Sequence, residues 1–357
     1  MKDAPLLNVV LVLALAIMIG WLMAIGRSVI LPIVMALIAV YVLHSASAAI
    51  SRLPGFKVLP LMVLRAAVLV AFAGVLFAAA TVISSTVREI LQVAPAYEAN
   101  LLAMIDGLSA RLNLDAQDVW DRVEAATIGR IDLDGLVLAL LGGFSSVGGV
   151  VFLVVLYVAF LMGERRSFER RIHAAMPGAA RGESMLTLLR KINANIGAYL
   201  AVKTLINLIL GTISFLIMYA LDVDFALFWA IVIGLLNYIP YVGSYLGVAF
   251  PVILSLGQFG DWTYSLLILA ALSAAQFVVG NVLEPKLIGR QMNLSPFVVL
   301  VALAVWGTLW GVPGAILAVP MTSVIAIVLS EFEATRPIVT LLANRVDETG
   351  TQPVSRN

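Results

Sequence analysis

The sequence predicts an all-α polytopic membrane protein with about six spanning helices, two re-entrant or broken helical segments and a small extramembrane helical domain. Of its 357 residues, 62% are hydrophobic and only 12% are charged, and the mean hydropathy is +1.05. A soluble domain carries about 25% charged residues. The stretches 4–26, 28–51 and 136–163 contain no charged side chain, and each is long enough to cross the roughly 30 Å of bilayer hydrocarbon as a helix.

Six unbroken helices account for most of the apolar sequence. We expect them near residues 6–26, 28–50, 58–84, 136–162, 196–220 and 262–283. The first helix follows Lys2 and is longer than the core of a secretory signal, and no A-x-A cleavage site directly follows it. We therefore expect it to be retained in the membrane, with a cleaved signal peptide as the alternative.

The residue types in the chain exclude several classes of chemistry. There is no cysteine, and the two histidines lack an H-E-x-x-H or similar spacing, so disulfides, thiolate metal sites and a catalytic metal centre are not expected. No Walker lysine, nucleophile elbow or catalytic triad pattern is present. The net charge of +1 argues against a nucleic-acid surface. We expect no enzymatic activity, no catalytic residues, no cofactor and no metal.

Charge divides the chain into regions. Residues 85–135 hold four Arg against nine Asp or Glu, whereas residues 163–195 hold seven Arg or Lys against three Glu. Positively charged loops stay in the cytoplasm, so 163–195 is predicted to be a cytoplasmic loop and 85–135 a periplasmic helical domain. Residues 1–84 then form the first three membrane helices, 136–335 form a larger membrane region, and 336–357 form a cytoplasmic tail.

Two longer apolar segments are each interrupted by helix-breaking residues. Segment 225–256 contains GLLNYIPYVGSYLG, and segment 297–330 contains WGTLWGVPGA. A single helix over the first segment would place Lys286 and Arg290 outside, against the preference of positive charges for the cytoplasm, whereas a reversal places them inside. Half of such a segment covers only about 20 Å as a helix, which is too short to span the bilayer. We predict two re-entrant hairpins that enter from opposite faces, as in many secondary transporters.

The first break gathers polar groups in an otherwise apolar segment. Asn237 can donate and accept hydrogen bonds, Tyr238 carries a hydroxyl, and Pro240 and Gly243 favour a turn. Backbone groups freed by a break in a membrane helix must be buried in protein or line a polar cavity. Asn237 and Tyr238 are therefore predicted to line a solute path. The alternative is a structural kink that neighbouring helices satisfy.

A second polar group lies in the stretch GNVLEPKLIGR. Glu284 is a carboxylate at the edge of a membrane helix, one turn from Asn281 and directly before Pro285, and Gly289 follows. Because proline disfavours an α conformation in the residue that precedes it, the helix is predicted to end at Glu284.

The charged residues of this region leave two interpretations open. Glu284 could titrate with transport or coordinate a cation, or it could form a helix-end salt bridge to Lys286, Arg290 or the basic loop. Lys203 lies about two turns into the helix predicted over 196–220. A lysine near a helix end usually extends to the membrane surface, and the alternative is a buried partner for Glu284 or for an anionic substrate. We include Lys203 among the path or gating residues.

The chain resembles the autoinducer-2 exporter family of bacterial permeases in two segments, GLLNYIPYVGSYLG and GNVLEPKLIGRQMNLSPFVVLVALAVWGTLWGVPGAILAVPMT. The likeness covers nearly the whole chain. It implies a multi-pass protein of the bacterial inner membrane that forms homo-oligomers. It also implies that the break from Asn237 to Gly243, together with Asn281, Glu284, Pro285 and Gly289, consists of motif positions.

We interpret the chain as a secondary transporter or facilitator that exports a small polar solute, with Glu284 as a coupling or gating carboxylate in the transport region 136–335. The resemblance implies that this solute is the quorum-sensing signal autoinducer-2. Two alternatives stay open: a Na⁺/H⁺ antiporter of the same family, and a membrane scaffold that uses 85–135 to bind partners. The expected partners are the lipid bilayer, a small polar solute or cation, and further copies of the chain, but no nucleic acid.

Overall fold

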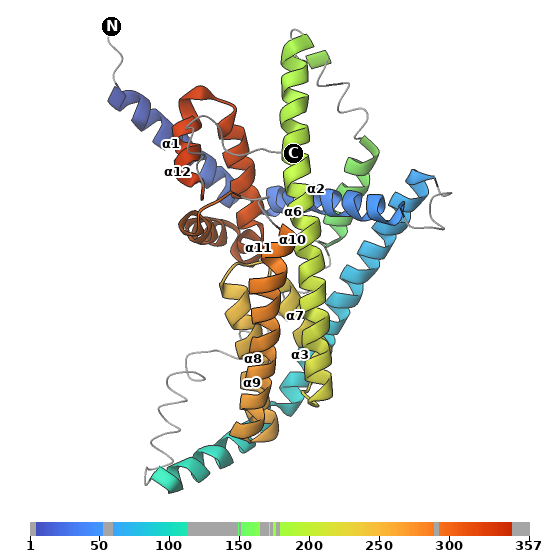
Figure 1. Ribbon diagram of the computed structural model, residues 1–357, viewed down its shortest axis with the longest axis vertical. Coiled ribbons are helices and arrows are strands. Elements are labelled where there is room, and N and C mark those ends of the chain that lie inside the picture. The colour runs from blue at the N-terminus through green and yellow to red at the C-terminus, as the bar shows by residue number, and fades with distance from the viewer. Residues whose placement is uncertain are drawn as a thin grey trace. The chain divides into compact units, whose positions relative to one another are not determined.

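The computed structural model describes residues 5–52, 60–112, 149, 151–164, 171, 174–175, 179–288 and 293–344, and every regular element within these ranges is a helix. In chain order the helices are α1 (Pro5–Ile25), α2 (Arg27–Ile50), α3 (Leu61–Leu112), α6 (Ala179–Ala220), α7 (Ala226–Leu236), α8 (Val242–Phe259), α9 (Trp262–Val278), η2 (Val279–Leu283), α10 (Glu284–Ile288), α11 (Pro296–Ser330), η3 (Glu333–Thr335) and α12 (Arg336–Leu342) (Figure 1). A further apolar helix, Val151–Glu164, precedes α6. Within the described part, six helices are long and apolar enough to cross a membrane. The predicted all-α polytopic class is confirmed.

The chain divides into two compact units, and each contains one of the two broken segments. The first unit comprises Met1–Leu59, Leu153–Ala201 and Arg290–Asn357, and the second comprises Pro60–Phe152 and Val202–Gly289. The boundary between the units therefore falls inside α6.

In the second unit, α7 and α8 form a helical hairpin. The helix α7 ends at Leu236, and the chain then turns, with Tyr241 at φ 63° and ψ −60°, before α8 begins. Gly243 lies so close to Leu236 that a β-carbon on it would overlap the carbonyl oxygen of Leu236. Further along, Gly247 of α8 faces Ile233 of α7. The chain therefore reverses at this break, as predicted, and α8 packs against α7, α9 and α3 (Figure 1).

Tight apolar packing and a few polar contacts hold this unit together. Its core contains Ile206, Leu210, Ile233, Ile268 and Leu272, all at most 2% exposed. Inside a bilayer such packing stabilises through van der Waals contact rather than through burial from water. At one end of the hairpin, α3 adds hydrogen bonds. The hydroxyl of Tyr97 donates to Asp224 Oδ2 at 2.5 Å, and Asn100 Nδ2 donates to the carbonyl oxygen of Gly257 at 2.9 Å.

In the first unit, α11 also doubles back. Gly311 adopts φ 67° and ψ −144°, a conformation that only glycine adopts readily. Residues Trp306 and Thr322 are 16 positions apart, which would separate them by about 24 Å along one straight helix. The Trp306 indole nevertheless donates to the Thr322 hydroxyl at 3.1 Å. The second predicted reversal is therefore confirmed, and Trp306 and Trp310 pack in an apolar cluster with residues of α1 and α2.

Two helices are longer than predicted. The helix predicted over 58–84 continues without interruption as α3 to Leu112. Its 52 residues extend about 78 Å, far beyond the roughly 30 Å of hydrocarbon, so part of α3 must lie outside the bilayer core. This length supports the extramembrane assignment of 85–135, which stays a prediction because 113–135 lie outside the described residues.

The second difference concerns α6. We predicted a loop over 163–195, but the chain is helical from Ala179. The additional helical turns bury Leu186 and Ile192, which are at most 9% exposed. A loop would leave these apolar side chains without their packing partners. The cytoplasmic location of this stretch stays a prediction.

Candidate solute-binding groove

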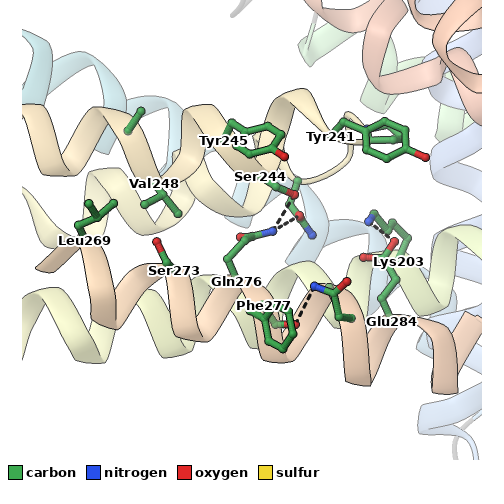
Figure 2. Close-up of a pocket in the computed structure, with 15 residues that line it drawn as sticks. Lys203, Tyr241, Ser244, Tyr245, Val248, Leu269, Ser273, Gln276, Phe277 and Glu284 are labelled. Carbon is green, nitrogen blue, oxygen red and sulfur yellow. Dashed lines mark hydrogen bonds and ion pairs between the residues drawn. The ribbon is translucent and has the colours of Figure 1, made fainter.

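The second unit contains a groove of about 780 Å³, within the size range of small-molecule sites. Its walls come from α6, from the turn between α7 and α8, from α8, and from the continuous run of α9, η2 and α10. The lining residues are Lys203, Asn237, Pro240, Tyr241, Ser244, Tyr245, Val248, Ala249, Leu269, Ser273, Gln276, Phe277, Gly280, Asn281 and Glu284. Figure 2 shows Lys203 and Glu284 at one end and Val248 and Leu269 towards the other. Polarity therefore changes along the groove.

The charged end is a buried ion pair. Lys203 is only 3% exposed, and its Nζ lies 2.5 Å from Glu284 Oε1. The Glu284 side chain keeps 27% exposure, facing the groove. Burial of an unpaired ammonium would be strongly unfavourable, so the carboxylate is what allows Lys203 to be buried. Lys203 does not extend to the membrane surface. The alternative interpretation, a buried partner for Glu284, is confirmed. Among the described residues Glu284 pairs with Lys203 and not with Lys286, and Arg290 lies outside the described residues.

The predicted helix end at Glu284 is wrong. Glu284 has helical angles, φ −59° and ψ −49°, and the helix continues through Pro285 to Ile288. The preceding turn, Val279–Leu283, is a π-helix, so that the Glu284 N–H donates to the Val279 carbonyl oxygen five residues earlier. A π turn is wider than an α turn. Pro285 follows this turn directly and has no N–H for which a partner is needed.

A chain of side-chain amides crosses the middle of the groove. Asn237, 4% exposed, donates through Nδ2 to Asn207 Oδ1 at 2.8 Å. Gln276 donates through Nε2 to Asn237 Oδ1 at 3.1 Å and to Ser244 Oγ at 2.8 Å. The Nδ2 of Asn207 is buried and has no hydrogen-bond partner among the described residues. Asn237 therefore ties the break to two neighbouring helices and also lines the groove, so features of both predicted interpretations are present.

The other predicted residues divide into three groups. Pro240 and Asn281 line the groove, and Asn281 Nδ2 also donates to the Phe277 carbonyl oxygen at 3.2 Å. Tyr238, which was predicted to line the path, and Gly243 are not among the lining residues. The Tyr238 hydroxyl is 2.7 Å from Thr204 Oγ1, and Gly243 makes the close approach within the hairpin. Pro285 is exposed and not part of the lining. Gly289 falls outside the described residues.

Sequence reasoning missed several polar residues of the groove, among them Gln276, Ser244 and Ser273. Gln276 carried a usable signal, because it is the one amide in the apolar run WTYSLLILAALSAAQFV of α9. A polar side chain inside a membrane helix tends to face protein or a cavity rather than lipid. The two serines carried little signal, since serine is also common where helices pack closely.

Comparison with known proteins places these motifs in a family. The family model described as AI-2E family transporter matches residues 9–334. The AI-2 transport protein TqsA of Escherichia coli strain K12 is 29% identical over 338 residues, 95% of this chain and 96% of the relative. A proposed transport protein of Haemophilus influenzae is 31% identical over 272 residues, 74% of this chain and 77% of the relative. The chain belongs to the AI-2E transporter family, and it is a multi-pass transport protein of the bacterial inner membrane.

Proposed function

We propose that this protein exports a small polar solute through the groove of its second unit, and that autoinducer-2 is that solute. The observation that carries the proposal is the convergence of a buried ion pair and an amide chain on one groove at a broken membrane hairpin. Such polar groups are expensive inside a bilayer and usually mark a substrate path. The name of the E. coli relative, AI-2 transport protein, supports the identity of the solute.

The chemistry of the groove supports a small, neutral, hydrogen-bonding solute. The charges of Lys203 and Glu284 cancel within the pair, so the groove offers no net charge to attract a strongly anionic or cationic cargo. The amides of Asn237 and Gln276 each offer a donor and an acceptor. A solute with hydroxyl and carbonyl groups can replace the bonds that these amides make to one another. Because such an exchange leaves few polar groups without a hydrogen bond, neither the binding nor the release of the solute costs much free energy.

Transport by purified protein in liposomes tests the proposal. We expect Asn237→Ala to lower the efflux of autoinducer-2 at least about tenfold, the loss of about 1.4 kcal/mol of favourable interaction, with unchanged assembly on size-exclusion chromatography. Thr212→Ala is the matched control, because Thr212 is exposed and bonds only within its own helix, to the carbonyl oxygen of Leu208. Unchanged efflux in Asn237→Ala would remove this residue from the path. A panel of other small polar solutes run in parallel tests the identity of the cargo.

Sodium–proton exchange is the second candidate, and one observation favours it. Glu284 is a carboxylate with 27% exposure in the groove, where Na⁺ could compete with the Lys203 ammonium for it. A pH-gradient assay in inverted vesicles, with and without Na⁺, separates the two functions. Dissipation of the gradient that depends on Na⁺ supports exchange, and its absence leaves solute export as the function of the groove.

A further inference from the structure

One helical run supplies a polar side chain to the middle of the groove and another to its charged end. Gln276 lies in α9, and Glu284 lies in α10, with the π turn Val279–Leu283 between them. Figure 2 shows Gln276 pointing towards Ser244 and Glu284 towards Lys203 from this run. The two side chains therefore lie on the same face of this helical run, although eight positions separate them in the sequence.

An unbroken α-helix would not place Gln276 and Glu284 on the same face. Each residue turns an α-helix by about 100°, so that residues seven apart align to within about 20° and residues eight apart differ by about 80°. Gln276 would align with Leu283, and Glu284 would align with Phe277. Phe277 is 63% exposed at the rim of the groove. In the structure, Leu283 instead packs against the apolar core, and Glu284 reaches the buried Lys203.

The π turn accounts for this difference. A π turn accommodates one more residue than an α turn, and the helix beyond it returns to its former register. Residues on the two sides that are eight apart in sequence then align as if they were seven apart. Gln276 and Glu284 are such a pair, and the Glu284 N–H bond to Val279 marks the extra residue.

We propose that the π turn Val279–Leu283 is a positioning element that turns Glu284 from the exposed rim to the inner wall of the groove, where it pairs with Lys203. Gly280 is the residue best suited to a test of this role. A β-carbon at Gly280 would meet no atom within 4 Å, so packing does not demand this residue. The functional part of the proposal rests on the proposed transport through the groove, whereas the pairing part can be tested without transport.

The test uses two changes of length with opposite consequences. Deletion of Gly280 removes the extra residue, so the turn becomes α-helical and Glu284 stays aligned with Gln276. Insertion of one Ala after Gly280 adds a second extra residue, which rotates Glu284 by about 100° towards the rim and brings Leu283 to the inner wall.

Pairing is measured by chemical cross-linking. The chain contains no cysteine, so the double variant Lys203→Cys/Glu284→Cys has no background thiols. Two long side chains separate the backbones, and a short bifunctional thiol reagent is therefore used instead of a direct disulfide. We expect the deletion to keep the cross-link and the insertion to lower its yield by at least about fivefold, since the thiol is rotated by about 100°. In the inserted chain the cross-link should move to the variant Lys203→Cys/Leu283→Cys.

Transport with a rescue variant completes the experiment. The insertion should abolish efflux, and the insertion combined with Leu283→Glu and Glu284→Leu should restore both the ion pair and efflux. A cross-link that stays at position 284 in the inserted chain, or that is lost in the deletion, overturns the proposal. If the insertion prevents folding, the deletion alone still tests the proposal through the cross-link between positions 203 and 284. Cross-links that shift as expected without any change in efflux support the positioning role and count against the proposed transport function instead.

Discussion

The two helical hairpins reverse the chain in different ways. The reversal between α7 and α8 surrounds Asn237 with side-chain amides, opens onto a groove, and holds a non-glycine residue, Tyr241, at φ 63°. The reversal within α11 uses Gly311 at φ 67° and lies among tryptophan and aliphatic side chains. A positive φ in a residue other than glycine costs of order 1–3 kcal/mol and is concentrated at functional sites. The first hairpin carries strain and polarity that the second avoids.

The difference shows how a broken membrane helix is stabilised in two settings. In α11 the indole N–H groups of Trp306 and Trp310 each find one acceptor, the Thr322 hydroxyl and the Met23 carbonyl oxygen. Both indole groups beside this break are thereby paired within the apolar cluster. At the turn between α7 and α8 the polar side chains form hydrogen bonds with one another across a groove, and a solute could replace these bonds. We therefore propose a packing role for the α11 hairpin and a transport role for the α7–α8 hairpin, and the following predictions test this division.

The largest effect is expected where both hairpins depend on glycine. A β-carbon at Gly243 would overlap the Leu236 carbonyl oxygen, and one at Gly314 would overlap the carbonyl oxygen of Trp306. Because backbone cannot move aside as a side chain can, Gly243→Ala and Gly314→Ala should each lower the free energy of unfolding by about 4 kcal/mol or more. Gly307→Ala is the control, since its β-carbon meets no atom within 4 Å. Thermal unfolding in detergent provides the measurement, and a normal melting temperature in either variant would contradict the close approach.

Breaking the ion pair should rank second. Glu284→Gln leaves the Lys203 ammonium buried without a counter-charge, and we expect a loss of about 2–4 kcal/mol, below the largest values for fully buried pairs because Glu284 retains some exposure. Lys203→Met/Glu284→Met should recover most of the stability, since no buried charge remains, but not the efflux. Chemical unfolding and liposome efflux are measured on the same preparations. A double variant that transports normally would show that the pair has only a structural role.

A matched pair of polar variants separates the two hairpins by function. Gln276→Ala removes the donor to Asn237 and Ser244, and Trp306→Phe removes the donor to Thr322. Each should cost about 1–2 kcal/mol of stability through unpaired polar groups. Only Gln276→Ala should also lower efflux, by about tenfold for a loss of 1.4 kcal/mol. Equal loss of efflux in both variants would contradict the division of roles between the hairpins.

The two chain reversals could be predicted from the sequence, because proline and glycine lie at each break and the charges of the neighbouring loops favour a reversal. Sequence reasoning also placed Asn237 and Glu284 in the same region of the chain. It did not predict that the helix passes through Glu284, since the general effect of Pro285 on its neighbour is overridden by a π turn that no residue pattern announces. It left the burial of Lys203 open for a related reason. Whether a lysine extends to the surface or is buried depends on a partner 81 positions away, and only the packing of α6 against α10 decides it.

The smallest effect is expected for a second lysine of α6. Lys191 pairs with Glu331 at 3.3 Å, but both side chains are more than 40% exposed, whereas Lys203 is buried and its partner Glu284 is 27% exposed. An exposed pair contributes about 0–1 kcal/mol and is screened by salt. Lys191→Met should therefore change the unfolding free energy by less than about 1 kcal/mol, and the change should vanish at high salt. Lys203→Met should be several times more destabilising and less sensitive to salt, because the Lys203 ammonium is only 3% exposed. If thermal unfolding at low and high salt gave equal losses for both variants, burial would not distinguish the two lysines, and the special role of the pair at the groove would have no energetic basis.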